Sequence, residues 1–358
     1  MARIIAIANQ KGGVGKTTTA VNLAASLAVA EQRTLLIDGD PQGNATSGIG
    51  LEGENLTSTV YDALIGQRSL DEVILRAIQF AHLDVAPTTP DLAGAEIELI
   101  DRENRELAMR DAIAPIRDRY DYVLIDCPPS LGLLTINMLA AADAVLIPVQ
   151  CEYYALEGLS QLLNTVHRIQ QSVNPDLAID GVLLTMYDAR LNLSRQVVTD
   201  AREYFGPKVF ETIIPRNVRL AEAPSFGKPI VLYDIASVGA QAYLSVAREI
   251  VQRHSTFERA PVTTAKVDHV LDDEHVGNDR HVEHAGNNVL ASDIKHGSND
   301  EPVLNAEPSP NIEHASNIEH GSDTEQASGT EHIASTKHIS STEHISNTEH
   351  VAEHVREE

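Results

Sequence analysis

The sequence predicts an α/β fold in which a doubly wound, mostly parallel sheet carries helices on both faces. Short apolar runs alternate with longer segments of helical periodicity over about the first 250 residues, and strands that are buried on both faces have this continuous apolar character. Several of the runs end in a carboxylate or lead into a glycine-rich turn. Because α/β proteins place ligand chemistry at the carboxyl ends of their strands, we expect the functional site along that edge.

The expected elements follow in order along the chain. Residues 4–8 read Ile-Ile-Ala-Ile-Ala and form the first strand, and a glycine-rich turn separates them from a helix over residues 20–27. Residues 34–37 and 122–126 are apolar runs with acids at their ends, residues 83–87 form a weaker strand, and residues 90–120 have apolar side chains at helical spacing. Further strands are expected at residues 144–149, 179–186 and 209–214, and further helices at residues 156–171, 193–204 and about 239–253.

A change of composition near residue 255 predicts two parts. Residues 1–254 hold 31 Asp and Glu against 21 Lys and Arg, whereas residues 255–358 hold 21 against 6. The second part repeats six-residue units with few large apolar side chains, so we expect a disordered, acidic tail. Twelve of the fifteen histidines lie beyond residue 260, which leaves a metal-binding tract open, although no compact His and Cys ligand spacing supports it. A hexapeptide β-helix is the third alternative.

Residues 1–254 are long enough to bury a full core without disulfide bonds. The chain has two cysteines, Cys127 and Cys151, which fits a reducing cytoplasm and implies no pairing. No run of eighteen or more apolar residues occurs, so we expect no transmembrane helix. The N-terminus has no charged region followed by a long apolar one, so we also expect no leader.

A glycine-rich turn follows the first expected strand and leads into the first expected helix. It reads Lys11-Gly12-Gly13-Val14-Gly15-Lys16-Thr17-Thr18. In such a turn the backbone N–H groups and the helix N-terminus hold a polyphosphate, and the glycines let the backbone approach its oxygens. Lys16 is placed to reach the β- and γ-phosphates, and the Thr17 hydroxyl is placed to ligate Mg²⁺. The alternative is an ordinary turn, but Gly-Lys-Thr between a strand and a helix favours phosphate binding.

The turn departs from the general phosphate-loop pattern at its first position, where Gln10 replaces glycine and a second lysine, Lys11, follows. This form resembles the deviant phosphate loop of the ParA/MinD group of ATPases. The resemblance implies that the chain binds ATP with Mg²⁺. It also implies that Lys11 reaches across an ATP-dependent homodimer to the nucleotide of the other subunit. The residues alone show only a second cation near the phosphates, so a solvated surface lysine stays the alternative.

Acids stand at the ends of two expected strands. Asp126 is at the position where a carboxylate holds Mg²⁺, and Asp38 and Asp40 lie in Asp-Gly-Asp-Pro-Gln-Gly-Asn, which resembles the second acidic motif of the ParA family. The resemblance implies that Asp40 orients or activates the attacking water, with Asp38 a supporting acid near the metal. Phosphoryl transfer needs mainly position and charge from the protein, so Lys11, Lys16 and Asp40 are the expected catalytic residues. The alternative for each acid is a turn residue or helix cap, and for Asp38 both readings stay open.

Two later segments resemble signatures of the chromosomal, Soj-type members of that family. They read Pro148-Val149-Gln150-Cys151-Glu152-Tyr153-Tyr154-Ala155-Leu156-Glu157-Gly158 and Ile214-Pro215-Arg216-Asn217-Val218-Arg219-Leu220-Ala221-Glu222-Ala223-Pro224-Ser225. The resemblance covers residues 2 to about 252 and does not extend into the tail. It implies that Pro215 and Asn217 lie beside the adenine, whereas by residue type alone Asn217 could be a helix N-cap.

Residues 186–230 hold seven Lys and Arg against five Asp and Glu, a basic island on an otherwise acidic body. Such an island can bind nucleic-acid phosphates without sequence readout, and it can equally be a solvated face. The family resemblance favours nonspecific binding of double-stranded DNA by the ATP-bound dimer. The positions that match the family's DNA-contacting arginines are Arg190 and Arg219.

The resemblance as a whole implies a DNA-partitioning ATPase that coats nucleoid DNA and is released when a ParB-like centromere-binding protein stimulates hydrolysis to ADP and phosphate. We therefore expect a cytoplasmic, nucleoid-associated protein that does not bind membranes. One alternative is a MinD-like membrane-associated positioning ATPase, which needs a basic amphipathic terminal helix that the Glu-rich C-terminus does not offer. Another is a redox ATPase like the nitrogenase iron protein, which the placement of the two cysteines disfavours. A pure transcription regulator is disfavoured because the loop begins at residue 11, leaving no room for an N-terminal helix-turn-helix.

Overall fold

A six-stranded parallel sheet forms the centre of the protein. The structure is a computed structural model, and it describes residues 1–51, 55–152 and 159–259. The strands lie in the order β3-β2-β4-β1-β5-β6, and each adjacent pair is parallel. Their bounds are β1 (Arg3–Ile7), β2 (Thr34–Asp38), β3 (Leu83–Ala86), β4 (Tyr122–Asp126), β5 (Ala144–Gln150) and β6 (Ala178–Thr185). The doubly wound parallel sheet expected from the sequence is confirmed.

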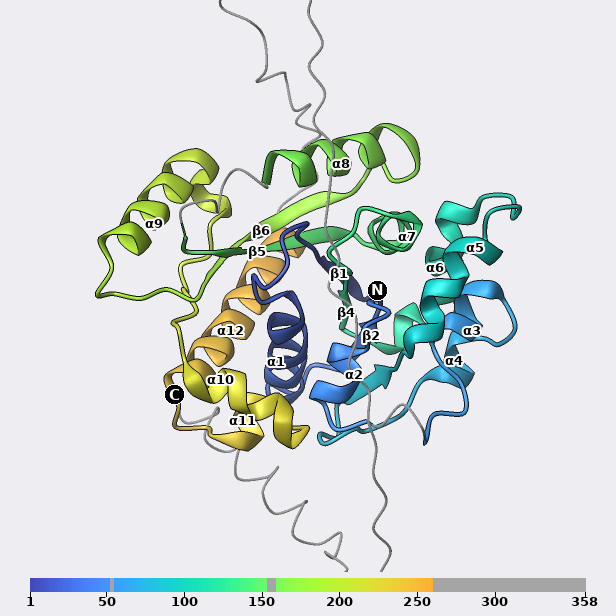
Figure 1. The fold of residues 1–358 in the computed structure, drawn as a ribbon, viewed down its shortest axis with the longest axis horizontal. Coiled ribbons are helices and arrows are strands. Elements are labelled where there is room, and N and C mark those ends of the chain that lie inside the picture. Colours follow the sequence, from blue (N-terminus) through green and yellow to red (C-terminus); the bar gives the residue numbers. More distant parts are fainter. Residues whose placement is uncertain (52–54, 153–158, 260–358) are drawn as a thin grey trace, which may run out of the picture. The chain divides into compact units, whose positions relative to one another are not determined.

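Helices connect the strands (Figure 1). The α-helices are α1 (Lys16–Val29), α2 (Asn44–Gly48), α3 (Val60–Ile65), α4 (Leu70–Val73), α5 (Ala95–Glu98), α6 (Ala108–Ile113), α7 (Leu133–Ala141), α8 (Leu159–Ser172), α9 (Asn192–Phe205), α10 (Val218–Glu222), α11 (Ile230–Tyr233) and α12 (Val238–Arg259). Short 3-10 turns are η2 (Pro90–Gly94), η3 (Arg105–Leu107), η4 (Arg117–Arg119), η5 (Gly206–Lys208) and η6 (Ala223–Phe226).

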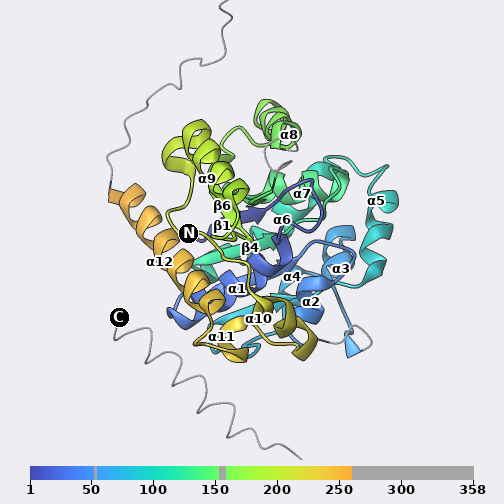
Figure 2. The same ribbon diagram turned by 60° about the vertical axis from the view of Figure 1, so that its left-hand side comes forward.

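The two faces of the sheet bury different sets of helices. Side chains alternate along a strand, so Ile4 and Ala6 of β1 pack with α3, α6, α7, α8 and α9, whereas Ile5 and Ile7 pack with α1, α11 and α12. Figure 2 shows the second group together on one side of the sheet. This two-layer burial explains why the strand sequences are apolar throughout rather than alternating.

Helix α1 is buried on almost every side, between the sheet and α12. Its small residues, among them Ala24 and Ala25, are fully buried and leave room for α12 to pack closely. The buried hydroxyl of Ser26 donates a 2.7 Å hydrogen bond to the backbone oxygen of Asn22, so it carries no unmet polar group into the core. Helix α1 therefore gives the loop that precedes it a rigid support.

Two expected elements differ in the structure. Residues 90–120 do not form one helix, because Asn104 adopts a left-handed conformation (φ +54°) and short turns and helices replace a continuous one. Residues 209–214 do not form a strand; of them, Val209 alone forms an isolated bridge to β6, with Val182. Their ladder is broken because the amides of Glu211 and Thr212 donate to the carboxylate of Glu249 on α12, at 2.9 and 3.1 Å.

The last described helix ends later than expected. Helix α12 continues to Arg259, beyond the expected end near residue 253. His254 contributes to this end of α12, where its Nε2 lies 2.9 Å from Oδ1 of Asp180 on β6. The expectations for the repeats and histidines of the tail lie outside the described residues. Among the described residues, no helix is both long and apolar enough to cross a membrane.

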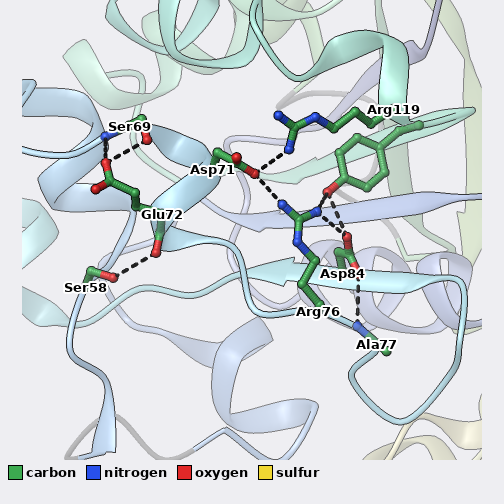
Figure 3. Close-up of polar contacts among 9 residues, drawn as sticks. Ser58, Ser69, Asp71, Glu72, Arg76, Ala77, Asp84 and Arg119 are labelled. Atoms are coloured by element: carbon green, nitrogen blue, oxygen red, sulfur yellow. Dashed lines mark hydrogen bonds and ion pairs between the residues drawn. The ribbon is translucent and has the colours of Figure 1, made fainter.

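The outer edge of β3 is covered by the chain that precedes it. Leu75 pairs with Val85 in an antiparallel bridge, and Asp84 of β3 accepts hydrogen bonds from the guanidinium of Arg76 and from the backbone N–H of Ala77, both at 2.9 Å (Figure 3). Asp71 of α4 accepts from Arg76 as well as from Arg119 of η4. This network fixes the segment between α4 and β3 against the sheet.

Candidate nucleotide site

The carboxyl ends of three central strands bring the expected loop and acids together. In the register of the sheet, Ile7 of β1 and Asp38 of β2 are both paired with Asp126 of β4. The loop from β1 to α1 therefore begins next to two carboxylates. This edge of the sheet is where an α/β fold places its ligands.

The loop between β1 and α1 has the backbone that a phosphate cradle needs. Gly13 and Gly15 are left-handed, with φ of +74° and +90°, and no atom lies within 4 Å of the position that a Cβ would take at Gly12 or Gly13. Glycine therefore keeps free the space over the loop, where phosphate oxygens would approach the backbone N–H groups.

Two buried side chains hold this loop to its neighbours. Asn9 accepts a 3.0 Å hydrogen bond from the backbone N–H of Lys11 and donates a 2.7 Å bond to the carbonyl of Pro148 on β5. Thr185, at the end of β6, donates its hydroxyl to the carbonyl of Val14 at 2.8 Å. The loop is thus held to β5 and β6 at Lys11 and Val14.

Lys16 is a buried cation at the start of α1. Its side chain is folded back over the loop, and its Nζ donates to the carbonyl of Lys11 at 3.2 Å. Burial lowers the pKa of the Lys16 amine, while the negative charges of Asp126 and Asp40 act in the opposite direction. A buried ammonium is unfavourable without a negatively charged partner. A phosphate group would be such a partner, because the ammonium can donate charge-assisted hydrogen bonds to its oxygens. Lys11 itself is half-buried.

Asp126 is fully buried, and neither of its carboxylate oxygens has a hydrogen-bond partner among the described residues. Burial raises the pKa of the Asp126 carboxyl well above its usual range, and the charge of Asp38 adds to this, whereas the Thr17 side chain and Lys16 oppose it. An unpartnered buried carboxylate is costly unless something binds it. Carboxylate and hydroxyl oxygens are ligands that Mg²⁺ accepts, so Asp126 and Thr17 fit this ion.

Asp38 and Asp40 have different surroundings from Asp126. Oδ2 of Asp38 accepts hydrogen bonds from both the backbone N–H and the hydroxyl of Thr46, each at 2.7 Å, and its Oδ1 accepts from the N–H of Asp40 at 3.3 Å. Asp40 is 6% exposed, and its Oδ1 accepts from the N–H of Gln42 at 3.0 Å. Burial raises the pKa of the Asp38 carboxyl, although the bonds from Thr46 and Asp40 reduce the rise.

A cavity of about 230 Å³ adjoins the loop at Gly15 and Thr18. Pro215 and Asn217 both line it, as do Met186 after β6, Leu220 and Ala221 of α10, and Tyr243 of α12. Asn217 also caps α10, because its Oδ1 accepts from the N–H of Arg219 at 2.7 Å, so both expectations for Asn217 are compatible. The apolar walls and the adjacent phosphate cradle give the cavity the form of a base pocket.

The two arginines expected to contact DNA lie on the surface and already have acidic partners. Arg190 forms a two-point ion pair with Asp188, at 2.9 and 2.6 Å. Arg219 contacts Glu222 at 2.9 Å and Asp234 at 3.4 Å. Both arginine side chains are more than half exposed, and exposed ion pairs are weak because water screens them, so exchange of a carboxylate for a phosphate costs little.

Several residues of the site were not found from the sequence. Thr46 forms a buried hydrogen bond to Asp38 eight residues before it, and Thr185 forms one to Val14 from a distant position in the chain. Tyr243 joins α12 to α1 through a 3.1 Å hydrogen bond between its hydroxyl and that of Thr19, and Met186 takes a left-handed conformation (φ +53°) at the cavity. No motif marks these positions. The two cysteines are free and buried.

The fold and this edge of the sheet define a phosphate-loop nucleotide-binding protein. The features that do so are the loop between the first strand and helix, the buried Lys16 and the unpartnered Asp126 across from it. A family model described as an AAA domain matches residues 2–179.

Relatives of known name then identify the family. The chain is 61% identical over 251 residues to a chromosome partitioning protein ParA of Myxococcus xanthus, covering 70% of this chain and 88% of the relative. It is 59% identical over 250 residues to the sporulation initiation inhibitor protein Soj of Bacillus subtilis, covering 70% of this chain and 98% of the relative. The chain therefore belongs to the ParA/Soj family of chromosome-partitioning proteins.

Solved structures share the fold. A protein named cobyrinic acid a,c-diamide synthase from Mycobacterium smegmatis, with bound ADP and magnesium, is 37% identical with a TM-score of 0.63, covering 74% of this chain and all of that one. The cell division ATPase MinD of Pyrococcus furiosus is 27% identical with a TM-score of 0.60, covering 71% of this chain and all of that one. The fold is thus shared with proteins of different names.

Proposed function

We propose that this protein is a Mg²⁺-dependent ATPase that partitions DNA: it dimerises on ATP, binds double-stranded DNA nonspecifically, and leaves DNA when a ParB-like centromere-binding protein stimulates hydrolysis. The observation that carries the proposal is the pairing of a phosphate cradle with a buried, unpartnered Asp126. Membership of the ParA/Soj family supports the choice of ATP and of DNA as ligands, and it favours action on the nucleoid in the cytoplasm.

In the proposed reaction the chain mainly positions and neutralises charge. The loop N–H groups and Lys16 hold the phosphates, and the cavity beside Pro215 and Asn217 takes the adenine. Asp126 and Thr17 would hold Mg²⁺, which neutralises charge that develops on the phosphate oxygens. Asp40 is the group proposed to orient the attacking water, because its carboxylate is near enough to Lys16 for its charge to raise the pKa of that amine.

The proposed dimer depends on Lys11, whose ammonium would reach the nucleotide of the other subunit. Lys11 stands in the exposed part of the loop and is half-buried, so it is accessible from outside. DNA binding would then follow from dimerisation, because two copies of the Arg190 and Arg219 surface double the number of phosphate contacts. Each contact adds about 0.9 to the slope of binding against salt.

DNA co-sedimentation of the full-length protein with ATP, ADP or no nucleotide tests the proposal, together with ATP turnover. We expect DNA binding with ATP alone, and a Lys11→Ala variant that binds ATP but neither dimerises nor binds DNA. Lys16→Ala serves as the comparison that loses nucleotide itself. DNA binding that is equal under all three conditions would contradict the proposed cycle, and a wild-type protein without ATP turnover would contradict the proposed enzyme.

A further inference from the structure

Thr46 connects three segments of the site through one hydroxyl group. Its Oγ1 donates to Oδ2 of Asp38 at 2.7 Å and accepts from the backbone N–H of Thr88 at 3.0 Å. The three residues thus linked come from the end of β2, the start of α2 and the chain that follows β3. Asp38, Thr46 and Thr88 are each 2% exposed or less, so water does not substitute for these bonds.

The loop closed by these bonds carries Asp40. Its backbone is tied at Gly39, whose N–H donates to the carbonyl of Asp126 at 3.0 Å, and at Asp40, whose N–H donates to Asp38. A Cβ at Gly39 would lie 2.8 Å from that Asp126 oxygen and 2.9 Å from Met138. The loop therefore sits directly against β4, and the bonds at Asp38 set where the Asp40 carboxylate lies relative to Asp126.

The hydrogen bonds of Asp38 also distinguish it from Asp126. Oδ2 of Asp38 accepts two short hydrogen bonds and Oδ1 accepts a third, whereas both oxygens of Asp126 accept none among the described residues. A metal ion at Oδ2 of Asp38 would have to displace the buried N–H and O–H of Thr46 and leave them unpaired, which is unfavourable, and the N–H of Asp40 already takes one site on Oδ1. At Asp126 a neighbouring side chain that lowers the pKa of the carboxyl is Thr17, which is itself an expected ligand of the ion.

We propose that Asp38 and Thr46 are positioning residues that hold Asp40 in place for hydrolysis, and that Asp38 is not a ligand of the metal ion. This inference rests on the proposed ATPase function. It differs from the sequence expectation that Asp38 is a supporting acid near the metal, for which a turn residue or helix cap is the alternative. Removal of the Thr46 hydroxyl should therefore slow turnover while leaving the binding of nucleotide and its dependence on Mg²⁺ unchanged.

The test compares Thr46→Val, Thr46→Ser and Thr34→Val in the full-length protein. Thr34 is the matched control, because it lies fully buried at the other end of β2 with its hydroxyl bonded to the carbonyl of Gln32 at 2.9 Å. Steady-state turnover gives kcat and KM, and a fluorescent ADP analogue titrated at several Mg²⁺ concentrations gives nucleotide affinity. Thermal melts establish that each variant is folded.

We expect Thr46→Val to lower kcat by about 10- to 100-fold, the usual scale for a misplaced catalytic group, with less than about a twofold change in KM and in the Mg²⁺ dependence. Thr46→Ser should restore turnover, and Thr34→Val should leave it unchanged. In an Asp40→Ala background Thr46→Val should cause no further loss, because Thr46 acts through Asp40. Additive losses would contradict the inference, as would normal turnover of Thr46→Val or equal loss in Thr34→Val.

The metal part of the inference is decided by binding alone. Asp126→Asn should shift the Mg²⁺ dependence of ADP-analogue binding, and Asp38→Asn should not. Equal shifts in the two variants would make Asp38 a metal ligand and overturn the inference. A wild-type protein that binds nucleotide but does not hydrolyse it would remove the proposed function, and this binding comparison would still decide the role of Asp38. It also decides the case in which Thr46→Val does not fold.

Discussion

Gly50 and Gly227 come into contact through their backbones, and the structure allows the energy of this contact to be worked out. Gly50 follows α2, and Gly227 follows η6. A Cβ at Gly50 would lie 2.8 Å from the carbonyl oxygen of Gly227, and that oxygen also accepts a 2.6 Å hydrogen bond from the Gln79 side chain. Gly66, which follows α3, provides a control, because its φ of +81° matches the +83° of Gly50 and no atom lies within 4 Å of its Cβ position.

Replacement of either glycine by alanine forces a left-handed backbone on alanine, at a cost of about 1–2 kcal/mol. In Gly66→Ala that cost stands alone, and it is partly offset by the lower entropy of the unfolded chain. In Gly50→Ala the methyl group must also move Gly227 away, which costs about 1–3 kcal/mol for overpacking and puts the hydrogen bond from Gln79 at risk. We therefore expect Gly50→Ala to be less stable than Gly66→Ala by about 2 kcal/mol.

Thermal unfolding of the two full-length variants, followed by far-ultraviolet circular dichroism, measures this difference. A difference of about 2 kcal/mol corresponds to a Tm about 4–8 °C lower for Gly50→Ala than for Gly66→Ala in a body of this size. Equal Tm values would refute the reasoning, since they would mean that the backbone contact between Gly50 and Gly227 does not constrain the folded state.

Three further outcomes are expected. Asp40→Ala should bind ATP and DNA but turn over slowly, and normal turnover would remove Asp40 from the mechanism. Arg219→Glu should lose DNA binding and keep ATP turnover, with the charge reversal Arg110→Glu on α6 as the control; DNA binding that survives in Arg219→Glu would place the surface elsewhere. Burial raises the pKa of the Cys151 thiol to about 11 from 9.0, so the folded protein keeps this proton longer than the unfolded chain, and stability should fall between pH 9 and 11. Cys151→Ala should reduce that alkaline loss by at most about 3 kcal/mol, and equal losses in the two proteins would contradict the assignment.

The parts of the fold that follow from local pattern were predictable from the sequence. The strands that end in Ile7, Asp38 and Asp126 are continuous apolar runs. A strand that is buried on both faces needs apolar side chains throughout, so such runs can be recognised in the sequence. The loop with Lys16 follows from the spacing of glycine, lysine and threonine between a strand and a helix. These features depend on neighbours in the chain, so one sequence is enough to find them.

Features that depend on distant partners were not predictable. Residues 209–214 have the sequence of a strand, but two of their backbone N–H groups donate to the carboxylate of Glu249. Glu249 lies on α12, far along the chain, so the sequence near residue 209 does not indicate this contact. The same holds for Thr46, whose hydroxyl acquires its role only when the chain after β3 brings the N–H of Thr88 to it. The residue type of Asp38 fits both roles that the sequence leaves open, and the proposed choice between them rests on its hydrogen bonds.

Helix α10 has only five residues, yet it faces two ways. Leu220 and Ala221 form part of the wall of the cavity, while the side chain of Arg219 between Val218 and Leu220 points outward and is 54% exposed. The wall of the cavity and the exposed guanidinium therefore belong to consecutive residues of one short helix, so any ligand that shifts the backbone of α10 from the cavity side also shifts Arg219.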